Sequence, residues 1–239
     1  MATDTTPSRS RVLLINPNSN RRTTDLMTGI AEKILAPEGL EVVGLTATEG
    51  PDMIIDPVGL QSSVKHVQTA VHHYLDGPDG SAVVAVIVAA IGDPGRVELA
   101  RNLNIPVVGI GQGAIRAAAG PGRRFGMATS TPLLADSLAS LVEEHGQTQW
   151  FTGVRLTPSE PLVLAGEPEK QFQELLEAVK QSSRDDGAQA VIIAGGPLSE
   201  TAQRIAATGT AEIIQPVPSA CSLVLNAINR QPLATHGGE

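Results

Sequence analysis

Short apolar runs alternate with longer amphipathic stretches along most of the chain. Residues 40–48 and 82–90 have the length and composition of strands, whereas 23–35 and 56–75 place apolar side chains at helical spacing. An alternation of strands and helices favours a parallel sheet whose strands are joined by right-handed crossovers. We therefore predict an α/β fold.

The same order of elements occurs twice, with little residue identity between the two halves. We expect two pseudo-symmetric, Rossmann-like lobes with parallel sheets. The active site should lie in the cleft between the lobes, because open parallel sheets bind ligands at the ends of their strands. Residues 1–10 are predicted to form a flexible N-terminal arm. Lobe 1 should comprise 11–115 together with 213–239, and lobe 2 should comprise 116–212.

Composition narrows the possible partners. Hydrophobic residues make up 41% of the 239 residues but aromatic ones only 2%, so the core must be mainly aliphatic. The net charge of −8 argues against a nucleic-acid partner, and no apolar run reaches the roughly 20 residues that span a membrane. Cys221 is the single cysteine, which excludes an intramolecular disulfide. We expect a cytoplasmic protein with a small-molecule substrate.

Four strand ends carry small or polar residues where a helix is expected to begin: "NPNSN", "AAIGDPG", "ATSTP" and "AGGPLSE". Hydroxyls and free N–H groups at helix starts favour an anion such as a carboxylate or an imide oxygen. The simpler interpretation is helix capping, which such residues provide in any protein. The candidate substrate-binding residues are Asn16, Asn18, Ala90, Ile91, Gly92, Thr129, Ser130, Thr131, Ala194, Gly195 and Gly196.

The motifs "INPNSN", "EGP", "GDPG", "IPVVGIG" and "FGMATSTPLLADSLASLVEEHG" together resemble the Asp/Glu/hydantoin racemase superfamily, in particular its hydantoin and allantoin racemase branch. The resemblance covers about residues 11–230. It implies cofactor-independent chemistry between two lobes, and a homo-oligomer. It also implies a pair of cysteines, one per lobe, of which one takes a proton from the substrate carbon and the other returns one.

The sequence departs from this pattern at the cysteines, because the matching residues are Ala90 and Ala194. Alanine has no proton to transfer, so two-thiol chemistry is excluded at these positions. This departure leaves three explanations open. The cysteines were exchanged by engineering, the protein only binds its ligand, or its chemistry has changed.

Three residues are candidates to replace the thiols as catalytic groups. Asp93 lies in the strand end "AAIGDPG", although it would also suit the N-cap of a helix that begins at Pro94. Glu200 lies near a helix start, where a carboxylate is favourable in any case. Cys221 is either a small buried hydrophobe or a thiol whose pKa is lowered by a helix N-terminus.

No metal or nucleotide cofactor is expected. His66, His72 and His73 do not have the spacing of a zinc helix, and the chain contains neither a dinucleotide nor a P-loop fingerprint. We therefore predict an isomerase-like enzyme that acts on a small carboxylate, carbonyl or cyclic imide compound. A lyase, decarboxylase or cyclase that works by positioning and oxyanion stabilisation is the alternative, as is a non-catalytic binding protein.

Overall fold

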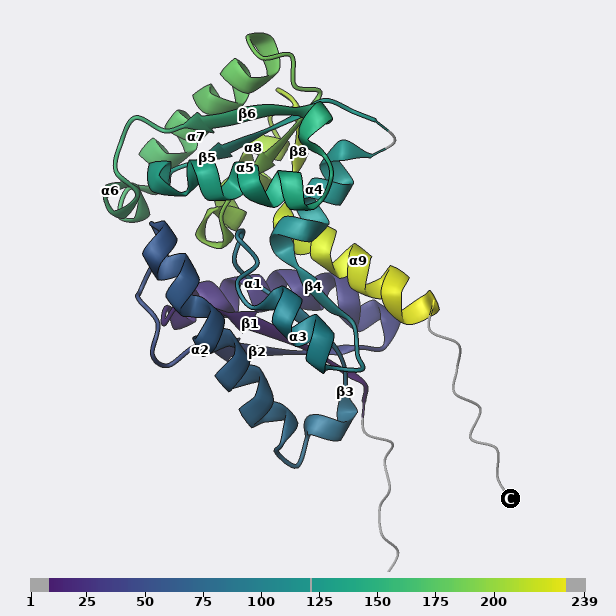
Figure 1. Cartoon of the computed structure of the whole chain (residues 1–239). Coiled ribbons are helices and arrows are strands. Elements are labelled where there is room, and N and C mark those ends of the chain that lie inside the picture. The colour runs from purple at the N-terminus through teal and green to yellow at the C-terminus, as the bar shows by residue number, and fades with distance from the viewer. Residues whose placement is uncertain (1–8, 121, 231–239) are drawn as a thin grey trace, which may run out of the picture.

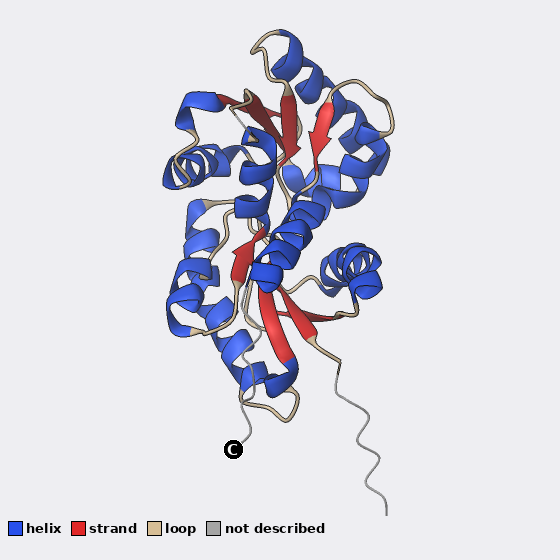
Figure 2. Ribbon diagram, turned by 90° about the vertical axis from the view of Figure 1, so that its right-hand side faces the viewer, coloured by secondary structure: helices blue, strands red, loops and turns tan. Residues whose placement is uncertain are grey.

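The structure, a computed structural model, describes residues 9–120 and 122–230. Most of the predicted N-terminal arm (1–8) and the end of the chain (231–239) lie outside the described residues. The chain forms two lobes, each built on a parallel four-stranded sheet with helices on both sides (Figures 1 and 2). The predicted fold of two α/β lobes is thereby confirmed.

The first lobe contains the sheet of order β2-β1-β3-β4. Helix α1 begins where the Asn20 side chain accepts a hydrogen bond from the Thr23 N–H, and it buries Met27, Ala31 and Leu35 on its apolar face. The strands are β1 (Arg11–Asn16), β2 (Glu41–Thr46), β3 (Val83–Val88) and β4 (Val107–Gly109), and the helices are α1 (Arg21–Leu35), α2 (Pro57–Leu75), α3 (Arg96–Asn102) and α4 (Ile110–Ala119).

The second lobe repeats this order as β6-β5-β7-β8, so each strand of one sheet has a counterpart four strands later in the other. The apolar β5 and β7 lie at the centre of the sheet and are buried throughout. The strands are β5 (Phe125–Thr129), β6 (Phe151–Leu156), β7 (Ala190–Ile193) and β8 (Glu212–Ile214), and the helices are α5 (Ala135–Glu144), α6 (Pro161–Ala165), α7 (Pro168–Arg184), α8 (Ser199–Ala206) and α9 (Pro216–Arg230), with a short 3-10 turn η5 (Gly196–Leu198) before α8.

The two lobes exchange helices. Helix α4 follows β4 of the first lobe, but Ala114, Ile115 and Ala118 on it belong to the core of the second lobe. Helix α9 follows β8 of the second lobe and contributes Val217 and Val224 to the core of the first (Figure 1). Of the two predicted lobe boundaries, 115/116 falls within α4 and 212/213 falls within β8.

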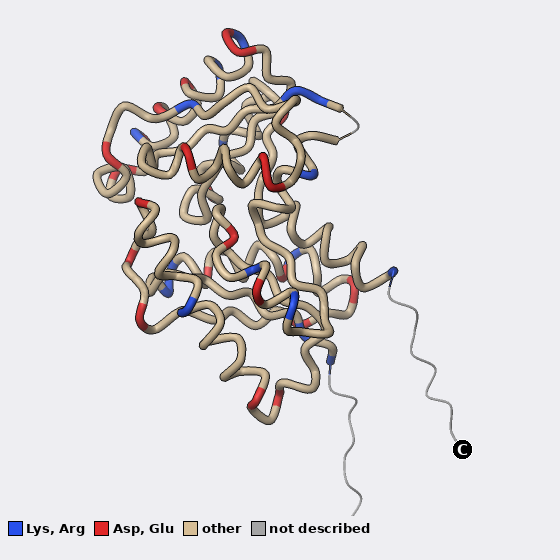
Figure 3. The backbone as a smooth tube through the Cα atoms, viewed as in Figure 1, with Lys and Arg blue, Asp and Glu red and all other residues tan. Residues whose placement is uncertain are grey.

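Acidic and basic positions are interspersed over the backbone of both lobes (Figure 3). Among the described residues, no helix combines the length and the apolar character needed to cross a membrane.

Candidate active site

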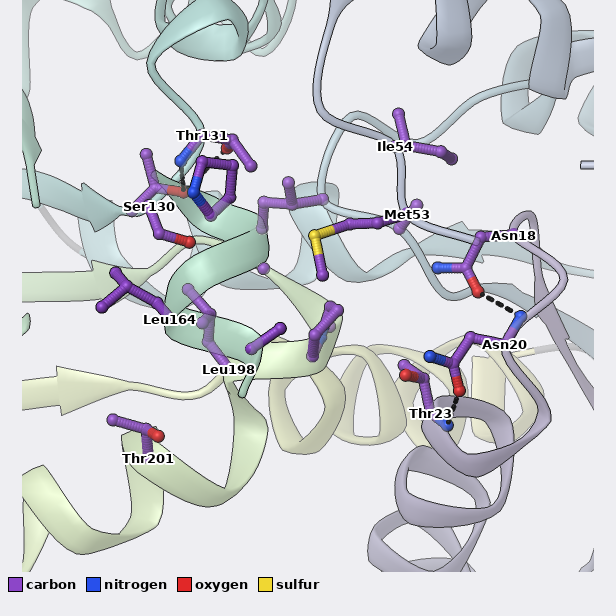
Figure 4. Close-up of a pocket in the computed structure, with 18 of the residues that line it drawn as sticks. Asn18, Asn20, Thr23, Met53, Ile54, Ser130, Thr131, Leu164, Leu198 and Thr201 are labelled. Carbon is purple, nitrogen blue, oxygen red and sulfur yellow. Dashed lines mark hydrogen bonds between the residues drawn. The ribbon is translucent and has the colours of Figure 1, made fainter. Parts of the chain in front are cut away.

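A cavity of about 740 Å³ lies between the lobes, at the carboxyl ends of the strands. Figure 4 shows lobe 1 residues such as Asn18 and Met53 facing lobe 2 residues such as Ser130 and Leu198 across it. Its lining includes Asn18, Asn20, Thr23, Leu26, Met53, Ile54, Leu60, Ala89, Ala90, Ile91, Gly92, Thr129, Ser130, Thr131, Leu134, Leu164, Gln171, Ala194, Gly195, Gly196, Leu198, Glu200 and Thr201.

The tip of β1 supplies a fixed amide. Asn16 is fully buried beneath the cavity wall, and its amide nitrogen donates to Asn18 Oδ1 at 2.8 Å and to Thr24 Oγ1 at 3.0 Å. Asn18 Oδ1 also accepts from the Asn20 N–H at 3.0 Å. With its oxygen occupied in this way, Asn18 directs its amide nitrogen toward the cavity (Figure 4). Asn16 is therefore a support for the site, and Asn18 is a donor within it.

The first elbow, residues 89–92, follows β3. Its turn is closed by a hydrogen bond from the Asp93 N–H to the Ala90 carbonyl at 2.9 Å. Within the described parts of the chain, the N–H groups of Ile91 and Gly92 donate to no protein acceptor. Both residues line the cavity, so this elbow offers backbone donors to a ligand.

The second elbow, residues 194–196, follows β7 and lies against the first. The Thr129 hydroxyl donates to the Ala194 carbonyl at 2.8 Å, which fixes the elbow to the tip of β5. A Cβ atom on Gly196 would lie 3.4 Å from the Ala89 carbonyl oxygen and 2.8 Å from Met27 Sδ. Glycine at this position thus allows the two lobes to approach each other at the elbows.

The strand register identifies which elbow residues correspond. Val88 pairs with Ile15, and the next N–H, that of Ala89, donates to the Ile15 carbonyl. In the second sheet Ile193 pairs with Ala128, and the Ala194 N–H donates to the Ala128 carbonyl. Ala194 is therefore the counterpart of Ala89, and Gly195 is the counterpart of Ala90.

Asp93 lies behind the elbow and does not line the 740 Å³ cavity. Helix α3 begins at Arg96 with Gly95 as its N-cap, so the predicted N-cap role of Asp93 for a helix at Pro94 is wrong. Asp93 instead caps α4: its carboxyl oxygens accept from the N–H groups of Gly111 at 2.8 Å and Gln112 at 2.6 Å. These are two of the N–H groups that a helix start leaves without partners.

The environment of Asp93 is strongly constrained. It is the one non-glycine residue with positive φ, 49°, among the described residues. A Cβ on Gly109 would lie 2.0 Å from Asp93 Cγ, so glycine is needed there to admit the carboxyl group. Burial raises the pKa of Asp93 to about 7, although the two N–H donors and Arg96, 3.9 Å away, oppose that shift. In the sequence, the signal for this contact of Asp93 was the pair of glycines, Gly109 and Gly111, in "IPVVGIG".

Cys221 is not part of the site. It is fully buried within α9, in the core of the first lobe, and burial raises the pKa of its thiol to about 12. It lies in the sixth position of the helix, too far from the first turn for the N-terminus to activate it. The small-hydrophobe interpretation therefore describes Cys221, and a catalytic role does not.

Glu200 does reach the cavity, at the second position of α8, and it is exposed at the rim. The other ionisable groups that line the cavity, Arg22, Asp25, Asp52 and Arg204, are exposed as well. The buried part of the wall is neutral, with amides, hydroxyls and aliphatic groups only. No group of three or more potential metal ligands occurs in the described residues.

Several lining residues could not be identified from the sequence. Met53 and Ile54 follow β2 and lie just after the "EGP" motif but outside it, and Gln171 and Thr201 lie within α7 and α8. Asn20 ends the recognised motif "INPNSN" and Thr23 follows it, and capping chemistry was the available signal for both. The remaining predicted binding residues, Thr129, Ser130 and Thr131, line the cavity together.

Comparison with known proteins places these features in a family. The model of the family described as Asp/Glu/Hydantoin racemase matches residues 12–224. The chain is 23% identical over 215 residues to a hydantoin racemase of Paenarthrobacter aurescens, covering 88% of each protein. It is 26% identical over 197 residues to a hydantoin racemase of Pseudomonas sp. strain NS671, covering 82% of this chain and 76% of that protein. The crystal structure of allantoin racemase from Pseudomonas fluorescens has the same fold, with a TM-score of 0.84, 23% identity, and coverage of 92% and 91% of the two chains.

Proposed function

Because the chain belongs to the Asp/Glu/Hydantoin racemase family, a family of isomerase-type enzymes, we propose that it acts on a small carboxylate, carbonyl or cyclic imide compound. The main support is that both elbows, 89–92 and 194–196, line one cavity between the lobes. A cytoplasmic location and a homo-oligomeric state belong to the same proposal.

The neutral donors of the cavity suit a substrate whose carbonyl oxygen gains negative charge. The Asn18 amide nitrogen is available after β1, and the N–H groups of Ile91 and Gly92 are available at the first elbow. Ser130 and Thr131 line the same cavity from lobe 2 and carry hydroxyl groups (Figure 4). Fixed donors of this kind stabilise the enolate-like charge that develops when a carbon next to a carbonyl loses a proton.

Proton transfer must differ from the two-thiol chemistry that the family resemblance implies. Ala90 and its counterpart Gly195 carry no titratable group, and neither does Ala194. Of the three candidate catalytic residues, Glu200 alone lines the cavity, so we assign it the role of acid or base. Its exposure keeps the carboxylate hydrated, which lets water relay a proton between it and the substrate.

A second candidate is supported by the neutral interior of the cavity. A lyase, decarboxylase or cyclase needs charge stabilisation and positioning more than a pair of bases, and a binding protein needs neither. All ionisable lining groups lie at the exposed rim, which suits these activities.

Proton exchange in deuterated water distinguishes the two candidates. With a 5-substituted hydantoin, the isomerase should introduce deuterium at C5, as observed by proton NMR, and Glu200→Gln should slow this by about a hundredfold. The control is Glu98→Gln, another exposed glutamate near a helix start but outside the cavity, which should change nothing. Release of CO₂ from a malonate without exchange would identify a decarboxylase. Thermal stabilisation by the hydantoin without turnover would identify a binding protein.

A further inference from the structure

In lobe 2 the cavity wall includes Leu164, Leu198, Gln171 and Thr201, a part of the cavity that we call the side arm. In Figure 4 the two leucines lie between Ser130 and Thr201, and Thr201 is on α8. A reacting carbon with its carbonyl group occupies only a small part of 740 Å³. The side arm therefore has room for a substituent of the substrate.

A buried amide–hydroxyl pair forms part of the side arm. The Thr201 hydroxyl donates to Gln171 Oε1 at 2.6 Å, and the two residues are only 4% and 9% exposed. Gln171 Nε2 donates a long bond of 3.4 Å to the Leu164 carbonyl. Since an amide nitrogen has two hydrogens, one N–H of Gln171 has no protein acceptor among the described residues, and the Thr201 oxygen accepts no hydrogen bond there.

We infer that the substrate carries a neutral carboxamide-type group on its substituent, and that this group binds to Gln171 and Thr201. The inference rests on the proposed function, because the reacting end of the same molecule must lie at the elbows. A carboxamide offers both a carbonyl oxygen for the Gln171 N–H and an N–H for the Thr201 oxygen. Buried polar groups that are only partly paired are costly, so a ligand that completes both bonds gains affinity.

Charge at this end of the cavity favours a neutral group over a carboxylate. Arg204, one turn beyond Thr201, is already paired with Glu169 at 2.6 Å and lies over the Phe172 ring at 4.2 Å. Its charge is therefore compensated. A carboxylate would lose its hydration in the side arm and find a single N–H donor, and an alkyl group would leave both protein groups unpaired.

Three hydantoins with 5-substituents of equal length test the inference: 2-carbamoylethyl, 2-carboxyethyl and 3-methylbutyl. Calorimetric titration of the full chain should show the carbamoylethyl compound binding about tenfold more tightly than either of the others. Thr201→Val keeps the shape of the side chain and removes its oxygen, so it should reduce that preference to about twofold. Thr152→Val is the matched control, because its hydroxyl bonds to the Phe125 carbonyl outside the cavity, and the preference should be retained.

The outcomes separate this inference from the proposal on which it rests. Equal binding of the three hydantoins, or a preference that survives Thr201→Val, overturns the inference and leaves the proposed function intact. If none of the three binds, the cavity does not take cyclic imides; the inference then falls, and the proposed function is confined to carboxylates and other carbonyl compounds. Should Thr201→Val fail to fold, Gln171→Met removes the amide at equal length and must abolish the same preference.

Discussion

The two elbows occupy equivalent places in the two lobes, yet the helices that begin behind them are capped in different ways. Behind the first elbow, the carboxyl group of Asp93 accepts from the N–H groups of Gly111 and Gln112 at the start of α4. Behind the second, the counterpart of Asp93 is Leu198, which cannot accept a hydrogen bond. Helix α9 begins instead with Pro216 and has a second proline at Pro218.

The two lobes deal in different ways with the unpaired N–H groups at a helix start. A helix start leaves N–H groups without partners, and lobe 1 pairs them with a buried acid whereas lobe 2 removes two of them by using proline. The acid requires a strained backbone and two nearby glycines, but it couples the first elbow to α4 and hence to the core of the other lobe. The proline solution involves no such coupling. Substitutions at the first elbow should therefore destabilise the protein more than substitutions at the second.

The largest expected effect comes from Asp93→Ala. At pH 5 we expect the free energy of unfolding to fall by about 3 kcal/mol, because two buried N–H groups lose their acceptor. Urea denaturation measures this. Asp93→Asn keeps one acceptor oxygen and should lose about 1 kcal/mol. A loss as small for alanine as for asparagine would show that the cap on α4 contributes little.

Cysteines placed at equivalent elbow positions test the symmetry of the site. We expect Ala90→Cys with Gly195→Cys to accelerate deuterium exchange at C5 of a hydantoin by about a hundredfold over either single variant, since acid and base then flank the carbon. A Cβ at 195 lies 3.1 Å from Leu198 Cδ1, a flexible side chain that can move. The matched comparison is Ala90→Cys with Ala194→Cys, because Ala194 is 1% exposed. Greater exchange with cysteine at 194 would refute the equivalence derived from the register.

The pH dependence of stability reports on Asp93 directly. Burial raises its pKa to about 7 from 3.8, so the native state holds more protons than the unfolded chain between these values. The free energy of unfolding should therefore fall as pH rises from about 4 to 7, with a slope of up to about 1.4 kcal/mol per pH unit, and change little above. His145, whose pKa burial lowers to about 4, acts in the opposite direction in part of this range. The difference between the wild type and Asp93→Asn isolates the Asp93 contribution, and a flat difference would contradict the raised pKa.

The smallest effect is expected at the second helix start. Pro218→Ala should lower the free energy of unfolding by only about 0.5 kcal/mol, because it adds one unpaired N–H and one more flexible residue to the unfolded chain. Thermal unfolding of this variant beside Asp93→Ala compares the two caps. Equal losses would mean that both elbows depend on their helices to the same extent.

The sequence predicted the fold because periodicity and strand order are local signals. Apolar runs such as 82–90 and the polar ends of β1 and β5 were recognisable without knowing their neighbours. The role of Asp93 was not, since it depends on a helix start 18 residues away that turns back to the elbow. The sequence left two interpretations of Cys221 open for a similar reason: it does not show which side of α9 packs against the core. Gln171 and Thr201 become neighbours only when α7 and α8 pack together.

The exchange of α4 and α9 makes the two halves of the molecule mutually dependent during synthesis. A nascent chain that ends near residue 120 carries α4 with the apolar surface of Ala114, Ile115 and Ala118 uncovered, and it lacks the helix that completes its own core. Neither half is then a complete folding unit, so separately expressed halves should be recovered folded only when they are produced together.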